Sequence, residues 1–456
     1  MAIPRSLVGC KPLLDCWFKE SSVCMYQPRR FCSLVKLLWI LTLGGVVFVP
    51  CSSQTQNTTP LLLAHADQMV GYETSRGTVR ELSGNVQMRQ GTTEIRCDRA
   101  RQELWSGHAE LEGNILITQG AVRMRMQRGE YRSTERRAWG QGNVVIEDST
   151  TTLRAPLGIY ELDRQRAIFY RGVELRDSAT AVTADSVVYL RRTGERTAWG
   201  NVRIVFSRER TSVEGDSAYQ NPLENVAWVS GRCFLIEWDT TVNGDTLYLL
   251  AESLFMARDT TAQYVRARGN VRLLRGPLAA VADTAWLWER DSIQLEGNPT
   301  VWADSAQLSG NVITAQLRQG RVRRVVARGS AALGVVEDSL SLAPHQLLAE
   351  VITLRFDGDS LRAVSGSRNV HTLYLLRAED GAPDGLTRVA SDSVAIVLAA
   401  GRIERSSWYG SVQSEYVPEH RVQPEERYLQ GFRWRAETKP NRAVFLERLI
   451  SPSSRR

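Results

Sequence analysis

A short motif, a Gly that is usually followed by Asn and then by two apolar residues with one residue between them, returns along this chain of 456 residues. Clear copies start at Gly84, Gly113, Gly142, Gly172, Gly200 and Gly269, and weaker ones at Gly231, Gly297, Gly310, Gly329, Gly366 and Gly410. The first five steps, taken from Gly84 to Gly231, are 29, 29, 30, 28 and 31 residues long. A period of this size indicates one supersecondary unit copied along an axis, here about 11 times.

Each copy predicts a turn followed by a strand. Gly and Asn both tolerate positive φ, so the pair is typical of a tight turn. The two apolar residues that follow are two positions apart, which places them on one face of a strand. We expect this face to form the interior. The interior candidates are Val86, Met88, Ile115, Ile117, Val144, Ile146, Val173, Leu175, Val202, Ile204, Val271 and Leu273.

A second motif, a small residue followed by an acid, comes about 13 to 16 residues after many of the glycines. Examples are Cys97-Asp98, Ala184-Asp185 and Ala282-Asp283. Short polar side chains at such positions favour turn chemistry, in which they bond their own backbone. Each unit is therefore expected to read strand, turn, strand, turn, which predicts an all-β, antiparallel fold.

The residues that carry common catalytic or metal chemistry are sparse. The five His residues form no pair at ligand spacing, and there is no nucleophile elbow, P-loop or dinucleotide fingerprint. Five of the seven Cys lie before residue 54, and the other two, Cys97 and Cys233, are far apart and are expected to be buried thiols. We therefore expect no enzyme activity, no cofactor and no metal.

Residues 1–53 have the layout of a secretory signal peptide. Arg29–Arg30 precede an apolar run at 37–49, which is short for a membrane span, and Ser52–Ser53 follow it. We expect cleavage near Ser53 and a true start at Met25. Cys51 leaves a lipoprotein alternative open. Six basic and two acidic residues lie in this leader, so the remaining chain would carry about +3 of the +7 charge, which gives no argument for nucleic acid.

The repeats are expected to run over residues 64–412, either as one array or as two tandem units at about 64–250 and 251–412. Two prolines and several charges then interrupt the pattern. Residues 413–427 are expected to be a linker, and residues 428–456 a terminal strand or cap with a tail.

The Gly-Asn units, the acid-bearing strands between them and the leader together resemble the OstA-like family. This family includes the periplasmic lipopolysaccharide-transport protein LptA and the amino-terminal domain of LptD. The stretches 66–69, 82–86, 97–100 and 108–115 carry the resemblance. It covers most of residues 64–330 and extends more loosely to 412.

The resemblance implies an elongated, V-shaped β-jelly roll, open at both ends, whose groove holds the acyl chains of lipopolysaccharide. It implies a periplasmic bridge or chaperone in lipopolysaccharide transport, with peripheral association with the outer membrane. Partners would be other Lpt-type proteins, or copies of this chain, joined by edge-strand addition. The edges are expected near Ala66–Tyr72 and Tyr428–Phe432.

The sequence leaves several alternatives open. The twelve interior candidates are either a lipid groove or a closed protein core, and periodicity does not separate the two. A secreted β-solenoid enzyme acting on polysaccharide would need acidic or His side chains gathered on one stacked face. A structural or adhesive β-repeat protein would need no lipid.

Overall fold

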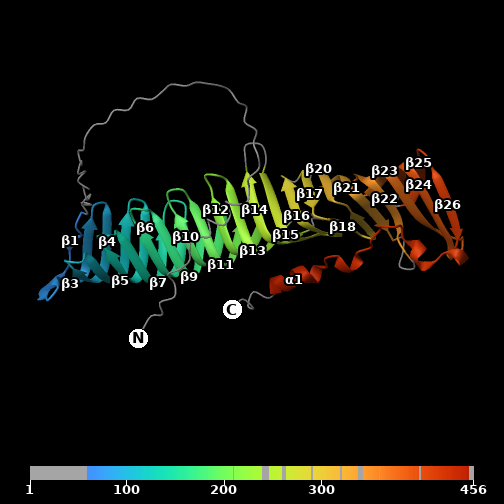
Figure 1. The fold of residues 1–456 in the computed structure, drawn as a ribbon. Coiled ribbons are helices and arrows are strands. Elements are labelled where there is room, and N and C mark those ends of the chain that lie inside the picture. Colours follow the sequence, from blue (N-terminus) through green and yellow to red (C-terminus); the bar gives the residue numbers. More distant parts are fainter. Residues whose placement is uncertain are drawn as a thin grey trace, which may run out of the picture. The chain divides into compact units, whose positions relative to one another are not determined.

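The computed structural model describes residues 59–208, 210–238, 246–258, 263–288, 291–318, 321–336, 343–358, 360–399 and 402–450. The predicted signal peptide therefore lies outside the described residues, as does the tail at 451–456. The structure is 74 % strand and 4 % helix, which confirms the all-β prediction. Its strands form one antiparallel sheet in which successive strands are neighbours over most of the length (Figure 1).

The strands are β1 (Leu62–His65), β2 (Gln68–Thr74), β3 (Gly77–Gln90), β4 (Thr93–Glu103), β5 (His108–Gln119), β6 (Val122–Arg132), β7 (Arg137–Glu147), β8 (Thr152–Glu161), β9 (Arg166–Arg176), β10 (Thr180–Leu190), β11 (Glu195–Phe206), β12 (Thr211–Asn221), β13 (Val226–Glu237), β14 (Leu247–Arg258), β15 (Gln263–Arg275), β16 (Leu278–Trp288), β17 (Ser292–Glu296), β18 (Thr300–Ala303), β19 (Ala306–Ser309), β20 (Val312–Arg318), β21 (Arg321–Val335), β22 (His345–Asp357), β23 (Ser360–Arg377), β24 (Pro383–Ala399), β25 (Arg402–Tyr409) and β26 (Gln413–Pro418). The helices are three 3₁₀ turns, η2 (Glu419–Arg421), η3 (Pro424–Arg427) and η4 (Ala436–Thr438), and one α-helix, α1 (Arg442–Ile450).

The repeated Gly-Asn pair lies in the middle of a long strand, so the prediction of a tight turn between strands is wrong. The pairing of β3 with β4 shifts register between Ser83 and Val86, which makes Gly84 and Asn85 a β-bulge. Both residues have positive φ, 76° and 49°, a conformation that Gly and Asn tolerate better than other residues. The bulge bends the strand without ending it, and we call this point the corner.

The acid of the second motif clamps the corner of the next strand. Asp98 Oδ2 accepts a hydrogen bond of 2.9 Å from Asn114 Nδ2, and a Cβ atom on Gly113 would lie 2.3 Å from that same oxygen. The prediction that these acids bond their own backbone in turns is therefore wrong at this position. Equivalent bonds join Asn85 to Asp67 (2.9 Å), Asn201 to Asp185 (3.0 Å), Asn270 to Glu252 (2.9 Å) and Arg232 to Asp216 (2.8 Å).

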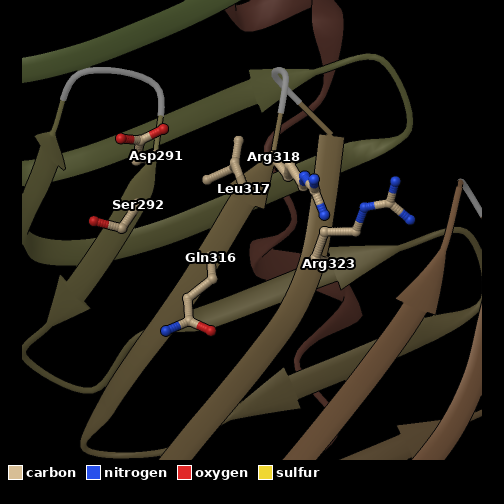
Figure 2. Close-up of a pocket in the computed structure, with 6 residues that line it drawn as sticks. All are labelled: Asp291, Ser292, Gln316, Leu317, Arg318 and Arg323. Atoms are coloured by element: carbon tan, nitrogen blue, oxygen red, sulfur yellow. The ribbon is translucent and has the colours of Figure 1, made fainter.

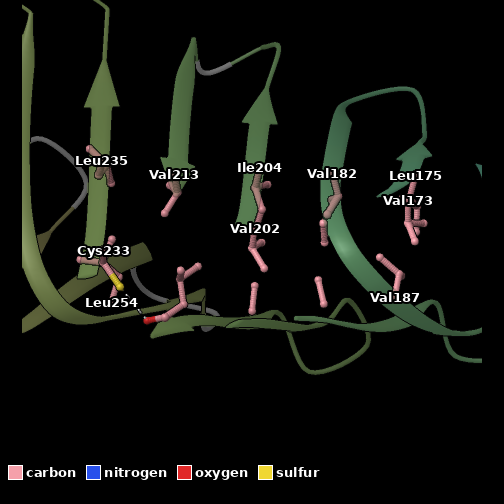
Figure 3. Close-up of a cluster of buried hydrophobic side chains, with 14 of the residues drawn as sticks. Val173, Leu175, Val182, Val187, Val202, Ile204, Val213, Cys233, Leu235 and Leu254 are labelled. Atoms are coloured by element: carbon pink, nitrogen blue, oxygen red, sulfur yellow. Dashed lines mark hydrogen bonds between the residues drawn. The ribbon is translucent and has the colours of Figure 1, made fainter. Parts of the chain in front are cut away.

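The corners divide every long strand into two segments and fold the sheet into two leaves. Leaf A contains residues 77–83 of β3 and the segments paired beside them, and leaf B contains residues 86–90 and their neighbours. Figure 3 shows Val202 and Ile204 on leaf B, and Val187 and Leu254 on leaf A across the interior. A single cluster of buried apolar residues runs between the leaves from Leu61 to Val394.

At four places the chain is interrupted at the corner, so that two short strands replace one long bulged strand. β16 pairs with both β17 and β18, which lie on either side of Gly297 and Asn298. In the same way β1 and β2 both pair with β3, and β25 and β26 both pair with β24. β19 and β20 likewise share β21. The sheet thus continues through these breaks, and a division of the repeats near residue 250 stays a prediction.

The carboxy-terminal region has a strand within the expected linker, and its described residues after 427, where a terminal strand or cap was expected, form no strand. Residues 413–418 of the expected linker form β26, and residues 419–450 contain 3₁₀ turns and α1. We call residues 419–450 the strap, because contacts place it along the outer face of leaf B, back toward the middle of the sheet (Figure 1). Phe445 of α1 packs with Phe234, Ile236 and Trp302 in a second apolar cluster. These outward apolar side chains need a cover, and α1 provides it.

Two buried glutamines bind the backbone of the strap through their side-chain amides, in the way that a neighbouring strand would. Gln346 Nε2 donates to the Arg427 carbonyl at 2.7 Å, and the Leu429 backbone N–H donates to Gln346 Oε1 at 2.8 Å. Gln307 makes the same pair of bonds, both 2.7 Å long, with the Arg433 carbonyl and the Arg435 N–H. Each amide therefore pairs with two backbone groups of the strap, one as donor and one as acceptor.

Candidate functional site

The structure brings all twelve interior candidates together on leaf B. Each is buried, with between 0 and 8 % of its surface exposed, and each belongs to the long apolar cluster. They come from β3, β5, β7, β9, β11 and β15, always from the two inward positions just after the corner. The rule that each copy aims its next two apolar residues inward therefore describes their placement correctly.

Leaf A supplies the opposite wall and has a different composition. One row of directly paired residues alternates small and large side chains: Ala109, Tyr131, Ala138, Tyr160, Ala167 and Tyr189. All six are at most 6 % exposed. The branched aliphatic residues of leaf B thus face a surface of alternating ridges and hollows, which allows close packing. Such an interior suits hydrocarbon, whether it comes from protein or from a ligand.

The ionisable groups beside the interior include two cysteine thiols. Burial, and then the charge of Asp98, raises the pKa of the Cys97 thiol to about 12, so that this thiol stays protonated and unreactive. Cys97 and Cys233 are both buried thiols, as predicted. Within the described residues, no group of three or more His, Cys, Asp or Glu side chains is arranged to hold a metal ion.

The outer surface of the described part offers pockets, but these are polar. Figure 2 shows the pocket at the hairpin ends of β17, β20 and β21, where Leu317 is the one apolar lining residue of six. A smaller pocket on the outer face of leaf B is lined by residues of β4, β5 and β6, four of them Glu or Arg. Neither pocket reaches the twelve interior candidates.

Two sheet edges are unpaired among the described strands. At one end, β1 and β2 pair only with β3, and Met69 and Val70 are more than half exposed. At the other end, β25 and β26 pair only with β24, and Tyr409 and Tyr416 are similarly exposed. The first edge lies where it was predicted. The second does not, because Tyr428–Phe432 belongs to the strap and forms no strand.

The repeat, the corner and the apolar interior can now be compared with known proteins. The family model described as OstA-like protein matches residues 58–209 of this chain. This match covers about a third of the chain. The resemblance drawn from the Gly-Asn and Ala-Asp units is thus confirmed for this segment.

The comparisons with curated proteins and solved structures add no further family. A search of the curated proteins finds no match. Among solved structures, the chain is similar to LptH of Pseudomonas aeruginosa, described as the LptA-homologous periplasmic component of the conserved lipopolysaccharide transport device. That similarity has 16 % sequence identity and a TM-score of 0.22, and it covers 27 % of this chain and 84 % of LptH. No helix among the described residues is long and apolar enough to cross a membrane.

Sequence reasoning missed the polar residues along the open edges of the two leaves. Tyr131, Tyr160 and Tyr189 recur at a step of 29 residues, and Asp148 and Asp177 are also 29 apart. The Gly-Asn motif recurs with nearly the same period, and this agreement is the signal that could have identified these residues. It was hidden because the tyrosines lie in strands, where an aromatic residue suggests ordinary packing.

Proposed function

We propose that this chain is a periplasmic lipid-binding component of lipopolysaccharide transport to the outer membrane, and that it holds acyl chains between leaf A and leaf B. The observation that carries the proposal is the continuous apolar cluster between the leaves, from Leu61 to Val394. It spans nearly the whole described chain, so a bound acyl chain would meet similar surroundings at each repeat. The OstA-like match of residues 58–209 directs the proposal to lipopolysaccharide.

The physical chemistry of such a role needs no catalysis. Each buried CH₂ group of an acyl chain gains about 0.8 kcal/mol over water. Near-equivalent sites along the axis would let a lipid move without a deep trap, with energy supplied by a separate motor. The bulges at the corners are the natural places for the leaves to pivot, because they interrupt the ladder of hydrogen bonds.

A closed structural repeat protein is the second candidate, and the low exposure of the interior favours it. With the twelve candidates at 0 to 8 % exposure, the leaves are in contact, so lipid would have to part them. The two functions differ in one property. In a lipid carrier, contacts between the two leaves are replaced by contacts with lipid at little net cost in free energy. A structural core stays closed as long as the protein is folded.

Lipid carried through purification tests the proposal. The chain is purified from cells that make lipopolysaccharide, and bound lipid is identified by mass spectrometry after denaturation. Ile117→Phe with Ile204→Phe fills the interior, and Leu116→Phe with Arg203→Phe changes the outward neighbours on the same strands. We expect lipid A species with the wild type and the outer pair, and a several-fold loss with the inner pair. Wild-type protein free of such lipid would refute the proposal.

Partners and location follow as parts of the same proposal. The exposed backbone of β2 at one end and of β25 and β26 at the other would accept strands from Lpt-type proteins or from copies of this chain. Strand addition at both ends would join interiors end to end across the periplasm, with contact at the outer membrane.

A further inference from the structure

The open edges of the two leaves are bonded to one another over β3–β11. We call the line where these edges meet the mouth, and the five cross-leaf pairs that close it the clasp. The pairs are Tyr131 Oη to Gln90 Oε1 (2.5 Å), Arg136 Nη2 to Thr93 Oγ1 (3.2 Å), Tyr189 Oη with Thr151 Oγ1 (3.4 Å), Arg191 Nε to Asp148 Oδ2 (3.3 Å) and Arg196 Nη2 to Asp177 Oδ2 (2.8 Å). Each joins a hairpin end of leaf A to a hairpin end of leaf B.

These bonds tie together strands that are far apart in the sheet. Tyr131 is on β6 and Gln90 is on β3, so their contact exists only because the leaves face one another. Gln90 Nε2 also donates to the Ser133 carbonyl of the facing edge at 2.9 Å. The clasp is therefore the polar closure of an otherwise apolar interior.

The row of directly paired residues on leaf A becomes more apolar beyond the clasp. Following the directly paired residues from Arg196 along leaf A leads through Gln220 and Ala227 to Leu287, Ile293 and finally Val325. The last three are partly buried apolar residues packed against the core. Among the described residues, this row of leaf A thus contains Tyr and Arg along the clasp and aliphatic side chains from Leu287 to Val325.

A polar mouth opens at lower cost than an apolar one. When the clasp separates, its Tyr, Arg and Asp groups exchange their bonds for water, so little is lost per bond. Two further nitrogens of Arg196, Nε and Nη1, are buried without a hydrogen-bond partner and would gain one in water. An aliphatic mouth would instead expose hydrocarbon on opening. The clasp is therefore a closure that can be released without unfolding the leaves.

We propose that the clasp is a lateral gate over β3–β11, which keeps acyl chains from passing sideways into or out of this half of the interior until its five pairs release. This inference rests on the proposed lipid-holding function. While the clasp is closed, a chain reaches this half only along the axis.

The two buried thiols report the gate directly. Cys97 lies on β4 inside the clasped half, and Cys233 lies on β13 beyond it. In the test variant, Tyr131→Phe removes one pair, and Asp148→Asn with Asp177→Asn removes the carboxylate charge from two more, with almost no change in volume. In the control, Tyr170→Phe, Glu112→Gln and Glu147→Gln make the same chemical changes on the outer face. Maleimide labelling of the full chain is followed at each cysteine by peptide mass spectrometry.

We expect labelling of Cys97 to accelerate by at least about tenfold in the test variant, while Cys233 and the control stay at wild-type rates. Unchanged labelling of Cys97, or a parallel rise at both thiols that marks global loosening, would overturn the gate. Binding of cis-parinaric acid is measured on the same proteins. If no variant binds it, the lipid-holding function fails even where Cys97 accelerates, so the two failures are distinguishable.

Discussion

The residue that decides the shape of this protein is the glycine at each corner. Gly113 has a φ of 78° and faces the Asp98 carboxylate so closely that no side chain fits between them. Gly and Asn supply the left-handed backbone, and the acid from the preceding strand fixes it through Asn114. The corner thus depends on three residues from two strands, which explains why both sequence motifs share one period.

Replacing Gly113 by Ala tests this account of the corner. We expect a loss of more than about 2 kcal/mol in the free energy of unfolding, because the change combines backbone strain with a clash. Gly120→Ala is the matched control: Gly120 also has a positive φ, 58°, but a Cβ there would meet no atom within 4 Å. In the double variant with Asp98→Ala, part of the lost free energy of unfolding should be recovered, because the carboxylate that clashes with the new Cβ is absent. Equal losses at the two glycines, measured by urea unfolding, would contradict the clash.

Acid should weaken the Asp177–Arg196 pair of the clasp. Burial opposes ionisation of Asp177, but the N–H groups of Ala179 and Thr180 and the Arg196 guanidinium outweigh it and hold the pKa of Asp177 below its ordinary value. Since the unfolded pKa is about 3.9, the stabilisation is complete above about pH 4 and is lost as the pH falls through the lower folded pKa.

Asp177→Asn should therefore cost about 1–3 kcal/mol in the free energy of unfolding at neutral pH, and its difference from wild type should shrink below about pH 4. Glu112→Gln, which breaks an exposed pair with Arg99, serves as the control and should cost less than about 1 kcal/mol. A cost of Asp177→Asn that stays constant from pH 7 to pH 3 would show that the carboxylate charge is not the cause.

Residue patterns predicted which side chains are buried but not which residues they meet. Alternation placed Val86 and Ile117 inside because side-chain direction follows the strand period. It could not pair Asp98 with Asn114, since that bond depends on the register of two strands. The Gly-Asn pair was assigned to a turn because positive φ is equally typical of turns and bulges, and only pairing on both sides separates them.

At the scale of elements, the strap is the feature that repeat analysis could not supply. It is unique in the chain, so no period reveals it, and its apolar residues fit a strand as well as a short helix. Its place is set by the outer face of leaf B, where Phe234, Ile236 and Trp302 replace the ion pairs of the earlier strands. A charged outer face such as that of Arg125 and Glu147 needs no cover.

Loosening the strap should leave the sheet folded. Gln307→Ala deprives two strap backbone groups of their partners, and Phe445→Ala removes a fully buried ring, so we expect losses of about 1–3 and 3–5 kcal/mol for strap attachment. Trypsin should then cleave after Arg435 and Arg442 many times faster than in wild type, with the sheet fragment intact. Val444→Ala, at a half-buried neighbour on α1, should change cleavage little. Slow cleavage in both variants would mean that the strap is held by other contacts.

At the scale of the whole molecule, the fold is a long sheet bent along one line of corners, with a hydrocarbon-like interior between its leaves. The all-β class and the repeat were predictable because the period of 29 or so residues is explicit in the sequence. Whether the interior admits lipid was not, since a filled core and a closed groove have the same inward residues. The answer depends on how readily the leaves part, which is a property of the corners and the clasp together.

The most direct test of a lipid-holding interior is photo-crosslinking in cells that make lipopolysaccharide. A photoreactive amino acid is placed at Ile117 or Ile204, which face inward, and at Leu116 or Arg203, which directly precede them and face outward. The account predicts lipopolysaccharide adducts at Ile117 and Ile204 and none at the outward neighbours. Adducts of equal yield at all four positions, or none at the inward pair in folded protein, would contradict it.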